Sequence, residues 1–323
     1  MKSGKMMKGS ARTDGFAKCD VACCWLIFFY CLVACSCRTT WESRAREDNF
    51  KYSYCTPTVT YESPAWPDSG LSKIPPGGLS PHDSILSSIL GIGAYLSELW
   101  TIPEDRGGEL RRLSLKQKID QRILVAETES AAVVAELDCE VERASLAGIY
   151  LDNLNSKYNH HLTIASVVTG ALTTAATALL SQHNAQAAVG VSGGLVSAAL
   201  ALSTINPKGR KIEFYHEKNL LQPIWDQAPV NTGYPLFVWK MLHTRQFSNS
   251  GSVTLAESIR RRWLQFELNG KADKDKEGLL FGSGGYYHSD ELHTRAAMLS
   301  QLQSTILSIN QDLASLVVVI GTL

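Results

Sequence analysis

The chain has 323 residues, of which 45% are hydrophobic and only 19% are charged. Its 31 lysine and arginine residues equal its 31 aspartate and glutamate residues, so no bulk charge favours nucleic acid or an anionic membrane as a partner. The length allows one or two domains with a sizeable core, and the plentiful alanine, serine and leucine favour helices packed on helices.

The N-terminus has the pattern of an export signal. Five basic residues precede an apolar run at residues 21–34, whose fourteen residues are too few for a comfortable membrane span of about 20. The run ends in Leu32-Val33-Ala34-Cys35, which resembles the lipobox of bacterial lipoproteins. That resemblance implies a signal peptide at 1–34, acylation of Cys35 and attachment to membrane lipid. Because Ser36 rather than aspartate follows, it also implies an outer-membrane address. The alternative is an uncleaved signal anchor in the inner membrane.

The cysteines are concentrated in this N-terminal segment. Six of the eight lie between residues 19 and 37, and only Cys55 and Cys139 fall beyond. A disulfide framework or a zinc site would spread its cysteines through the folded region, so we expect the cluster to serve something other than the fold. Residues 35–82 contain six prolines and no helical period, which predicts a flexible tether with aromatic residues able to dock on the body.

The remaining residues, 83–323, are predicted to form an all-α, elongated helical bundle or coiled coil. One helix begins after Asp83, and a long one begins near Glu109, with apolar or small residues at alternating steps of three and four. If this helix continues to Ser181, it is about 110 Å long, with a bend expected among Asn153, Asn155 and Asn159. A second heptad seam runs through the C-terminus. Its apolar positions are Leu292, Ala296, Leu299, Leu302, Ile306, Ile309, Leu313, Leu316 and Ile320.

Two similar stretches predict an apolar α-hairpin at residues 162–205. TGALTTAATAL at 169–179 and SGGLVSAALAL at 192–202 share six of eleven positions, and polar residues lie between them. Small residues recur at every fourth position, which lets two helix backbones approach closely. The predicted packing or insertion positions are Gly170, Thr174, Ala178, Gly190, Gly194 and Ala198.

Insertion of this hairpin into a bilayer is marginal on sequence grounds. Threonines interrupt the first limb, and the second limb, counted as 187–202, spans about 24 Å against a hydrocarbon core of about 30 Å. The hairpin is therefore either the buried tip of a bundle or a segment that inserts on a trigger. Long helices that end in a small-residue-rich apolar hairpin are similar in organisation to the ClyA-like toxins.

The second limb also contains G-x-S-x-G around Ser192, and this stretch resembles the patatin-type serine motif. A nucleophile elbow needs a preceding β-strand and an oxyanion loop, and residues 186–191 make a poor strand. The first limb repeats the stretch without the motif, which favours helix packing as its purpose. A serine hydrolase that uses Ser192 stays open as an alternative.

No other constellation predicts a cofactor or a metal site. Asp273, Asp275 and Glu277 begin like a calcium loop but lack the glutamate at position twelve. His288 and His293 flank the start of the C-terminal helix, where a structural role is favoured.

We therefore expect a non-enzymatic, lipid-anchored protein of the cell envelope. It would act as a structural or interaction module, with a protein partner in the envelope and heptad seams that also permit self-association. The first alternative is a membrane-perturbing or pore-forming protein that inserts residues 162–205.

Overall fold

The computed structural model describes residues 47–56, 79–103, 107–180, 183–205, 209–230 and 233–322. The predicted signal segment, with Cys35, lies outside these residues. The chain divides into two units, Met1–Asp48 and Asn49–Leu323, and the elements below all belong to the second.

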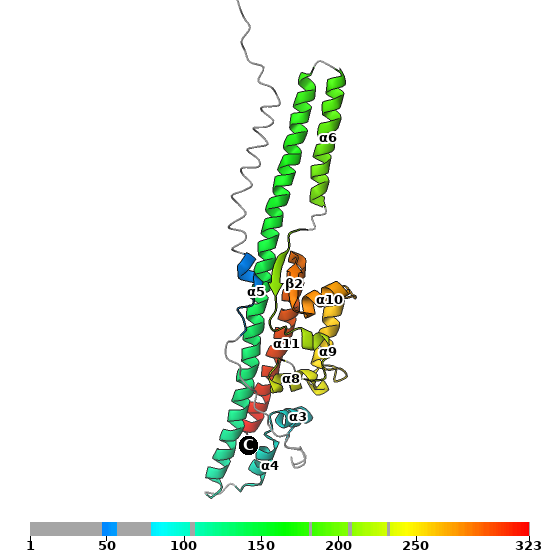
Figure 1. The fold of residues 1–323 in the computed structure, drawn as a ribbon. Helices are drawn as coiled ribbons and strands as arrows, with labels where there is room; N and C mark the ends of the chain where they lie inside the picture. The colour runs from blue at the N-terminus through cyan, green and yellow to red at the C-terminus, as the bar shows by residue number, and fades with distance from the viewer. Residues whose placement is uncertain are drawn as a thin grey trace, which may run out of the picture. The chain divides into compact units, whose positions relative to one another are not determined.

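Two long helices form the framework of the second unit (Figure 1). Helix α5, Glu109–Leu179, has 71 residues and is therefore about 107 Å long. Helix α11, Ser289–Gly321, runs antiparallel along its first half. Two contacts fix the pairing: Nε2 of His293 lies 2.8 Å from Oδ2 of Asp152, and ten residues later Gln303 donates to Asp138 at 3.0 Å. The prediction of an elongated all-α protein is confirmed.

Both predicted heptad seams are buried, one against the other. All nine apolar positions of the C-terminal seam are buried, and on α5 the seam from Ile119 to Leu151 is buried except for Val141, which is partly buried. Every residue from Asp152 to Leu180 is half-buried or exposed. The seam of α5 therefore ends at Leu151, although the helix continues for 28 more residues.

Acidic residues that the heptad pattern places off the seam are also buried. Glu136 and Glu140 are 8% and 5% exposed, and Nζ of Lys218 pairs with Oε2 of Glu136 at 2.7 Å. The chain that follows the hairpin, which includes Lys218, packs on this face of α5. In a two-helix coiled coil the same face would be exposed to water.

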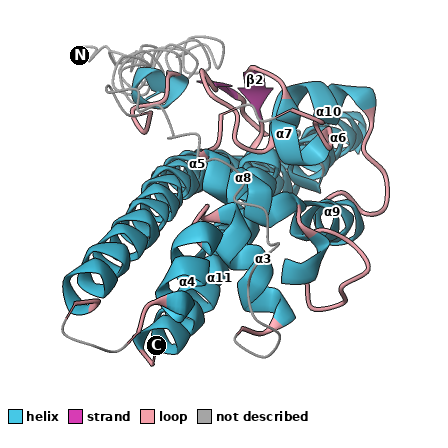
Figure 2. Ribbon diagram, turned by 90° about the horizontal axis from the view of Figure 1, so that it is seen from below, coloured by secondary structure: helices cyan, strands magenta, loops and turns pink. Residues whose placement is uncertain are grey.

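Shorter helices pack on one side of α5 and around α11 (Figure 2). Ser80, rather than the predicted Asp83, caps the first of them and accepts a hydrogen bond from the Asp83 amide at 3.1 Å. Thr254 caps α9 as its T-x-x-E pattern predicts, accepting from the amide of Glu257 at 3.1 Å. The bounds are α3 Pro81–Ile89, α4 Gly93–Thr101, α7 Gln222–Trp225, α8 Leu236–His243, η1 Arg245–Phe247, α9 Leu255–Arg262, η2 Trp263–Glu267 and α10 Lys274–Phe281.

One small sheet lies beside the first half of α5. Strand β1, Ile212–Tyr215, pairs antiparallel with β2, Gly284–Tyr287, with Ile212 opposite Tyr287. The sequence marks 212–215 as a candidate strand without a partner, and the partner is a glycine-rich segment that reads as a loop. Gly284 has φ +89°, and a Cβ there would lie 2.3 Å from the carbonyl oxygen of Phe214. The other candidate strand, at 236–239, is helical and belongs to α8.

Candidate functional site

The second half of α5 and helix α6, His183–Ile205, form an antiparallel hairpin (Figure 1). Oγ of Ser197 donates to the carbonyl of Ser166 at 3.0 Å, and the side chain of Gln186 donates to the carbonyl of Leu180 near the tip. Residues 158–179 of α5 rise about 33 Å and the 23 residues of α6 about 35 Å, so both limbs exceed a hydrocarbon core of about 30 Å. The second limb is longer than predicted because its helix continues through polar residues at both ends.

The hairpin carries no formal charge. Between Lys157 and Lys208 the sequence holds no aspartate, glutamate, lysine or arginine, a run of 50 residues. The asparagines do not interrupt the helix, since α5 is continuous through residues 153–159. Asn155 instead accepts a hydrogen bond from the amide of Arg210 at 2.9 Å, where the chain returns from α6.

Small and hydroxylated residues line the contact between the two limbs. A Cβ on Gly193 would lie 2.0 Å from Oγ1 of Thr173, and Cβ atoms on Gly170 and Gly190 would lie 3.5 and 3.6 Å from side chains of the opposite limb. Ser166 and Ser197 bond to each other across the same contact.

The predicted small-residue stripe is only partly at this contact. Gly170 and Gly190 lie there, but Thr174, Ala178, Gly194 and Ala198 are exposed, and nothing lies within 4 Å of a Cβ built on Gly194. Steps of four residues advance about 40° around a helix each time, so the stripe turns away from the contact. The true contact alternates steps of three and four, with Gly193 in place of Gly194.

Large apolar side chains point outward from the hairpin. Nine of them are between 47% and 87% exposed. They are Ile164, Val167, Val168, Leu172, Leu179, Val191, Leu195, Val196 and Leu202. Small and hydroxylated residues thus predominate at the contact between the limbs, and large apolar residues predominate on the outer surface. This arrangement is the reverse of a water-soluble hairpin. An exposed apolar surface of this extent marks a contact with lipid or with another protein.

The outward hydroxyl groups of the limbs are all satisfied within their own helices. Each donates to a backbone carbonyl four residues earlier, at distances of 2.7 to 3.0 Å. These residues are Thr163, Thr174, Ser192 and Ser203. A hydroxyl in hydrocarbon needs such an internal acceptor because no water is present to replace it.

Ser192 does not have the geometry of a nucleophile elbow. It lies in the interior of α6, with no strand before it, and its Oγ donates to the carbonyl of Ala188 at 2.7 Å. An elbow holds its serine on a sharp turn between a strand and a helix. The match to G-x-S-x-G therefore comes from the small residues of a helix.

Among the described residues, three helices are long and apolar enough to cross a membrane: α5, α6 and α11. The apolar window of α11 is partly buried, since its seam packs on α5, whereas none of the corresponding windows of α5 and α6 is buried within the protein. The hairpin is thus the part of the described chain with membrane-length helices and no protein cover.

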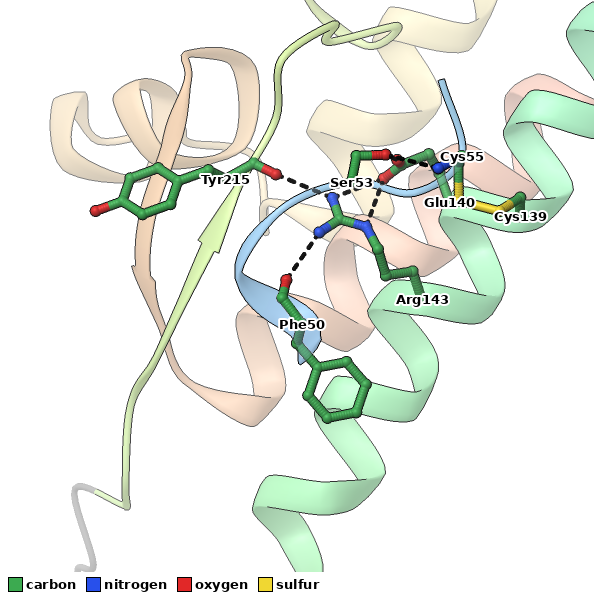
Figure 3. The surroundings of a disulfide bond; sticks show 7 residues. All are labelled: Phe50, Ser53, Cys55, Cys139, Glu140, Arg143 and Tyr215. Atoms are coloured by element: carbon green, nitrogen blue, oxygen red, sulfur yellow. Dashed lines mark hydrogen bonds and ion pairs between the residues drawn. A yellow bond between two sulfur atoms is a disulfide. The ribbon is translucent and has the colours of Figure 1, made fainter. Parts of the chain in front are cut away.

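A disulfide ties the segment before α3 to the first half of α5 (Figure 3). Cys55 is bonded to Cys139, across 84 residues of sequence, and in the next turn of α5 Arg143 donates to the carbonyl of Phe50 at 2.9 Å. Ser53 also donates to Glu140. Part of the predicted tether is therefore fixed on the body by the two cysteines that lie outside the N-terminal cluster. The cluster at 19–37 lies outside the described residues.

Arg143 is the centre of this attachment (Figure 3). Its side chain is fully buried, pairs with Glu140 at 2.9 Å, donates to the carbonyl of Tyr215 at 3.1 Å and stacks 3.7 Å from the ring centroid of Phe214. One guanidinium thus joins α5, the segment at Phe50 and strand β1. A buried arginine needs all of these partners because the desolvation of a lone charge is costly.

A second buried arginine lies close by. Arg295 on α11 donates to the carbonyl of Leu280 at 2.8 Å, and burial lowers its pKa. Burial, together with the charges of Arg295 and Arg143, also holds the pKa of His216 far below its usual value. His216 is therefore neutral, and its Nε2 lies 2.9 Å from the hydroxyl of Tyr287, whose pKa burial raises to about 12.

Several of the acidic and histidine residues considered as metal ligands have structural roles. Asp273 caps α10 and accepts from the amide of Lys276 at 2.7 Å, while the amide of His288, at the N-cap of α11, donates to Glu291 at 2.8 Å. His293 pairs with Asp152 and, through a hydrogen bond, lowers the pKa of that carboxyl.

Comparison of the chain with protein-family models, with curated proteins and with solved structures found no match in any of the three. The class that the geometry defines is therefore an all-α protein with a charge-free, membrane-length hairpin on a disulfide-bonded body.

Proposed function

We propose that the protein is an exported membrane protein that places its α5–α6 hairpin in a lipid bilayer. The observation that carries the proposal is the reversed polarity of the hairpin, with glycine, serine and threonine between the limbs and nine large apolar side chains outside. In water such a surface is unfavourable by about 25 cal/mol for each Å² of apolar area, and a bilayer removes that cost.

Length and charge support the same proposal. Each limb is long enough to cross, and the tip between Leu180 and His183 carries no formal charge, so it can pass through hydrocarbon. Both limbs start from the same end of the body, so the hairpin crosses and returns while the body stays on one side. The heptad seams are occupied by one another within the chain, so the proposal rests on the hairpin rather than on seams that recruit a partner.

The short chain between the predicted signal and Phe50 supports an N-terminal anchor for the body. Sixteen residues separate Ala34 from Phe50, a reach of at most about 55 Å. The Phe50 ring packs 5.9 Å from that of Tyr150, which is only two turns of α5 before Lys157. An N-terminal anchor, as an acylated Cys35 or as an uncleaved apolar run, would hold this end of the body close to the membrane. The disulfide favours an oxidising, exported compartment. Attachment to the outer membrane through Cys35 is the form of anchor that we propose.

The test is hydrogen exchange of the hairpin with and without lipid. The full chain is diluted from detergent onto phospholipid vesicles, and exchange is followed in peptides covering 162–180 and 187–202. We expect strong protection of both peptides in vesicles, because the backbone amides of an inserted helix are shielded from water. Exchange that is equally fast with vesicles and in buffer would contradict insertion.

A matched pair of variants at one position links protection to insertion. Gly194 faces outward into open space, so neither Gly194→Asp nor Gly194→Ala disturbs the contact between the limbs. An aspartate in hydrocarbon costs about 3 kcal/mol, so we expect Gly194→Asp to reduce insertion on the order of 100-fold and Gly194→Ala to leave it unchanged. Release of a trapped dye by the wild type, lost in Gly194→Asp, would add that the inserted hairpin perturbs the bilayer.

A further inference from the structure

Among the described residues, three basic ones flank the base of the hairpin, and we call Lys157, Arg210 and Lys211 the basic collar. Lys157 is the last charged residue of α5, and the other two follow the return from α6; all three are exposed. The hydrogen bond from the Arg210 amide to Asn155 places Arg210 within about one turn of Lys157 along α5. Gly209 permits this close approach, because its φ is +64° and a Cβ would lie 2.9 Å from Nδ2 of Asn155.

The collar has no acidic partner in the described part of the chain, whereas the acidic residues near it are engaged. Asp152 pairs with His293 at 2.8 Å, and Glu213 pairs with Lys51 at 2.5 Å. Asp290 lies in the first turn of α11, where it faces the positive end of the helix dipole. No ion pair among the described residues therefore neutralises the positive charge at the hairpin base.

The collar also lies at the depth where lipid headgroups would be. It begins where the charge-free limbs end, about 33 Å from the tip, which is slightly more than the thickness of a hydrocarbon core. Tyr158 follows Lys157 directly and is 54% exposed, and tyrosine is enriched at this boundary between hydrocarbon and water.

We propose that the basic collar binds the phosphates of anionic phospholipid headgroups and so selects anionic membranes for the hairpin. This inference rests on the proposed insertion. The net charge of the whole chain is zero, so the preference comes from local placement rather than from bulk charge. A basic side chain near an anionic surface strengthens binding about fivefold, so three give an effect on the order of 100-fold.

The experiment compares vesicles of pure phosphatidylcholine with vesicles that contain about one third phosphatidylglycerol. Exchange protection of the 162–180 peptide in the full chain is titrated against lipid, which reports insertion separately from any N-terminal anchor. The lipid concentration that gives half of the maximal protection should be on the order of 100-fold lower when phosphatidylglycerol is present. At 0.5 M salt this difference should be smaller, because the Debye length is then about 4 Å.

Charge removal at the basic collar and at a distant site on α5 separates local from general electrostatics. Lys157→Gln with Arg210→Gln and Lys211→Gln is expected to abolish the preference for phosphatidylglycerol and to leave insertion into phosphatidylcholine unchanged. The control removes the same number of charges with Arg111→Gln, Lys116→Gln and Lys118→Gln, which lie at least about 58 Å away along the helix. The control should keep the preference.

The outcomes distinguish the two proposals. Insertion into both vesicle types with no preference, or a preference that survives loss of the collar, would overturn the headgroup proposal and leave insertion standing. Failure to insert into either vesicle would overturn both. Inorganic phosphate at 10 mM should compete no better than chloride of equal ionic strength, and specific competition would overturn the assignment to a lipid headgroup.

Discussion

Helix α5 passes through two environments, and the difference between its halves shows what each half is built for. Up to Leu151 its seam residues are buried against α11, and most of its charged residues outside the Glu136–Arg143 region face outward. Beyond Lys157 the order is reversed, with hydroxyl groups and glycines at the contact and leucine, isoleucine and valine outside. The two halves of one continuous helix are therefore suited to different surroundings, water for the first half and, as proposed, lipid for the second. The face that carries the apolar residues determines which surroundings favour each half.

Removal of the disulfide should cause the largest loss of stability, and this loss should be confined to the body. Cys139→Ser opens a link that closes a loop of 84 residues, so we expect a loss of about 4 kcal/mol in the free energy of unfolding. Insertion of the hairpin into vesicles should not change, because the hairpin makes no contact with this link. Urea unfolding, with Cys55→Ser and the reduced wild type as controls, measures the loss; equal midpoints for oxidised and reduced protein would contradict it.

A pair of leucine substitutions tests the reversal of polarity directly. Leu299 is fully buried in the seam, so Leu299→Ala should cost about 3 kcal/mol of stability in water. Leu172 is 63% exposed, so Leu172→Ala should change stability in water by less than about 0.5 kcal/mol. The second variant should instead weaken insertion about threefold. Similar stability losses for both variants would mean that the hairpin is covered by protein.

The contact between the limbs can be tested with two neighbouring glycines. Gly193→Ala places a methyl group 2.0 Å from Oγ1 of Thr173, and the overpacking should loosen the hairpin by about 1 to 2 kcal/mol. Gly194→Ala meets nothing and should stabilise the helix by about 0.5 to 1 kcal/mol. Exchange rates of the amides at 166–177, measured in detergent, should rise in the first variant only.

The most gradual effect is the dependence of the stability of the body on pH. Burial holds the pKa of His216 far below 6.5, so below that pH the unfolded chain binds a proton that the folded chain does not. Stability should therefore fall as the pH drops from about 6.5, by up to about 1.4 kcal/mol per pH unit. His216→Phe should flatten this slope between pH 6.5 and pH 5. The paired Asp152, whose pKa is lowered, adds its own loss only below about pH 4.

The seams could be predicted from sequence because their signal is local and repeated. The apolar positions from Leu292 to Ile320 recur at steps of three or four over about eight turns of helix. Every one of those positions is buried in the structure. The hairpin is predicted too, from two similar stretches with small residues at every fourth position. Its contact face was misplaced because constant four-residue steps drift around a helix, which moved the prediction from Gly193 to Gly194.

The buried polar cluster around Arg143 could not be predicted from the sequence, because it forms through contacts between residues far apart in the chain. Cys55 and Cys139 are two isolated cysteines, and nothing between them signals that the segment at Phe50 returns to α5. Glu140 and Arg143 read as the solvated flank of a coiled coil until that segment and β1 cover them. Strand β2 is two glycines and two tyrosines, and only the partner strand gives it a structure.

In the proposed inserted state, the unbroken course of α5 sets the angle of the body about the helix axis. Each residue turns the helix by about 100°, so the loss of one residue between Leu151 and Leu162 would swivel the disulfide-bearing side by that angle. The loss of seven would change the angle of the body by only about 20°. Insertions or deletions between Leu151 and Leu162 should therefore preserve this angle only when they comprise seven residues or a multiple of seven. The helix that returns to Gly209 must then change in length by the same number of residues.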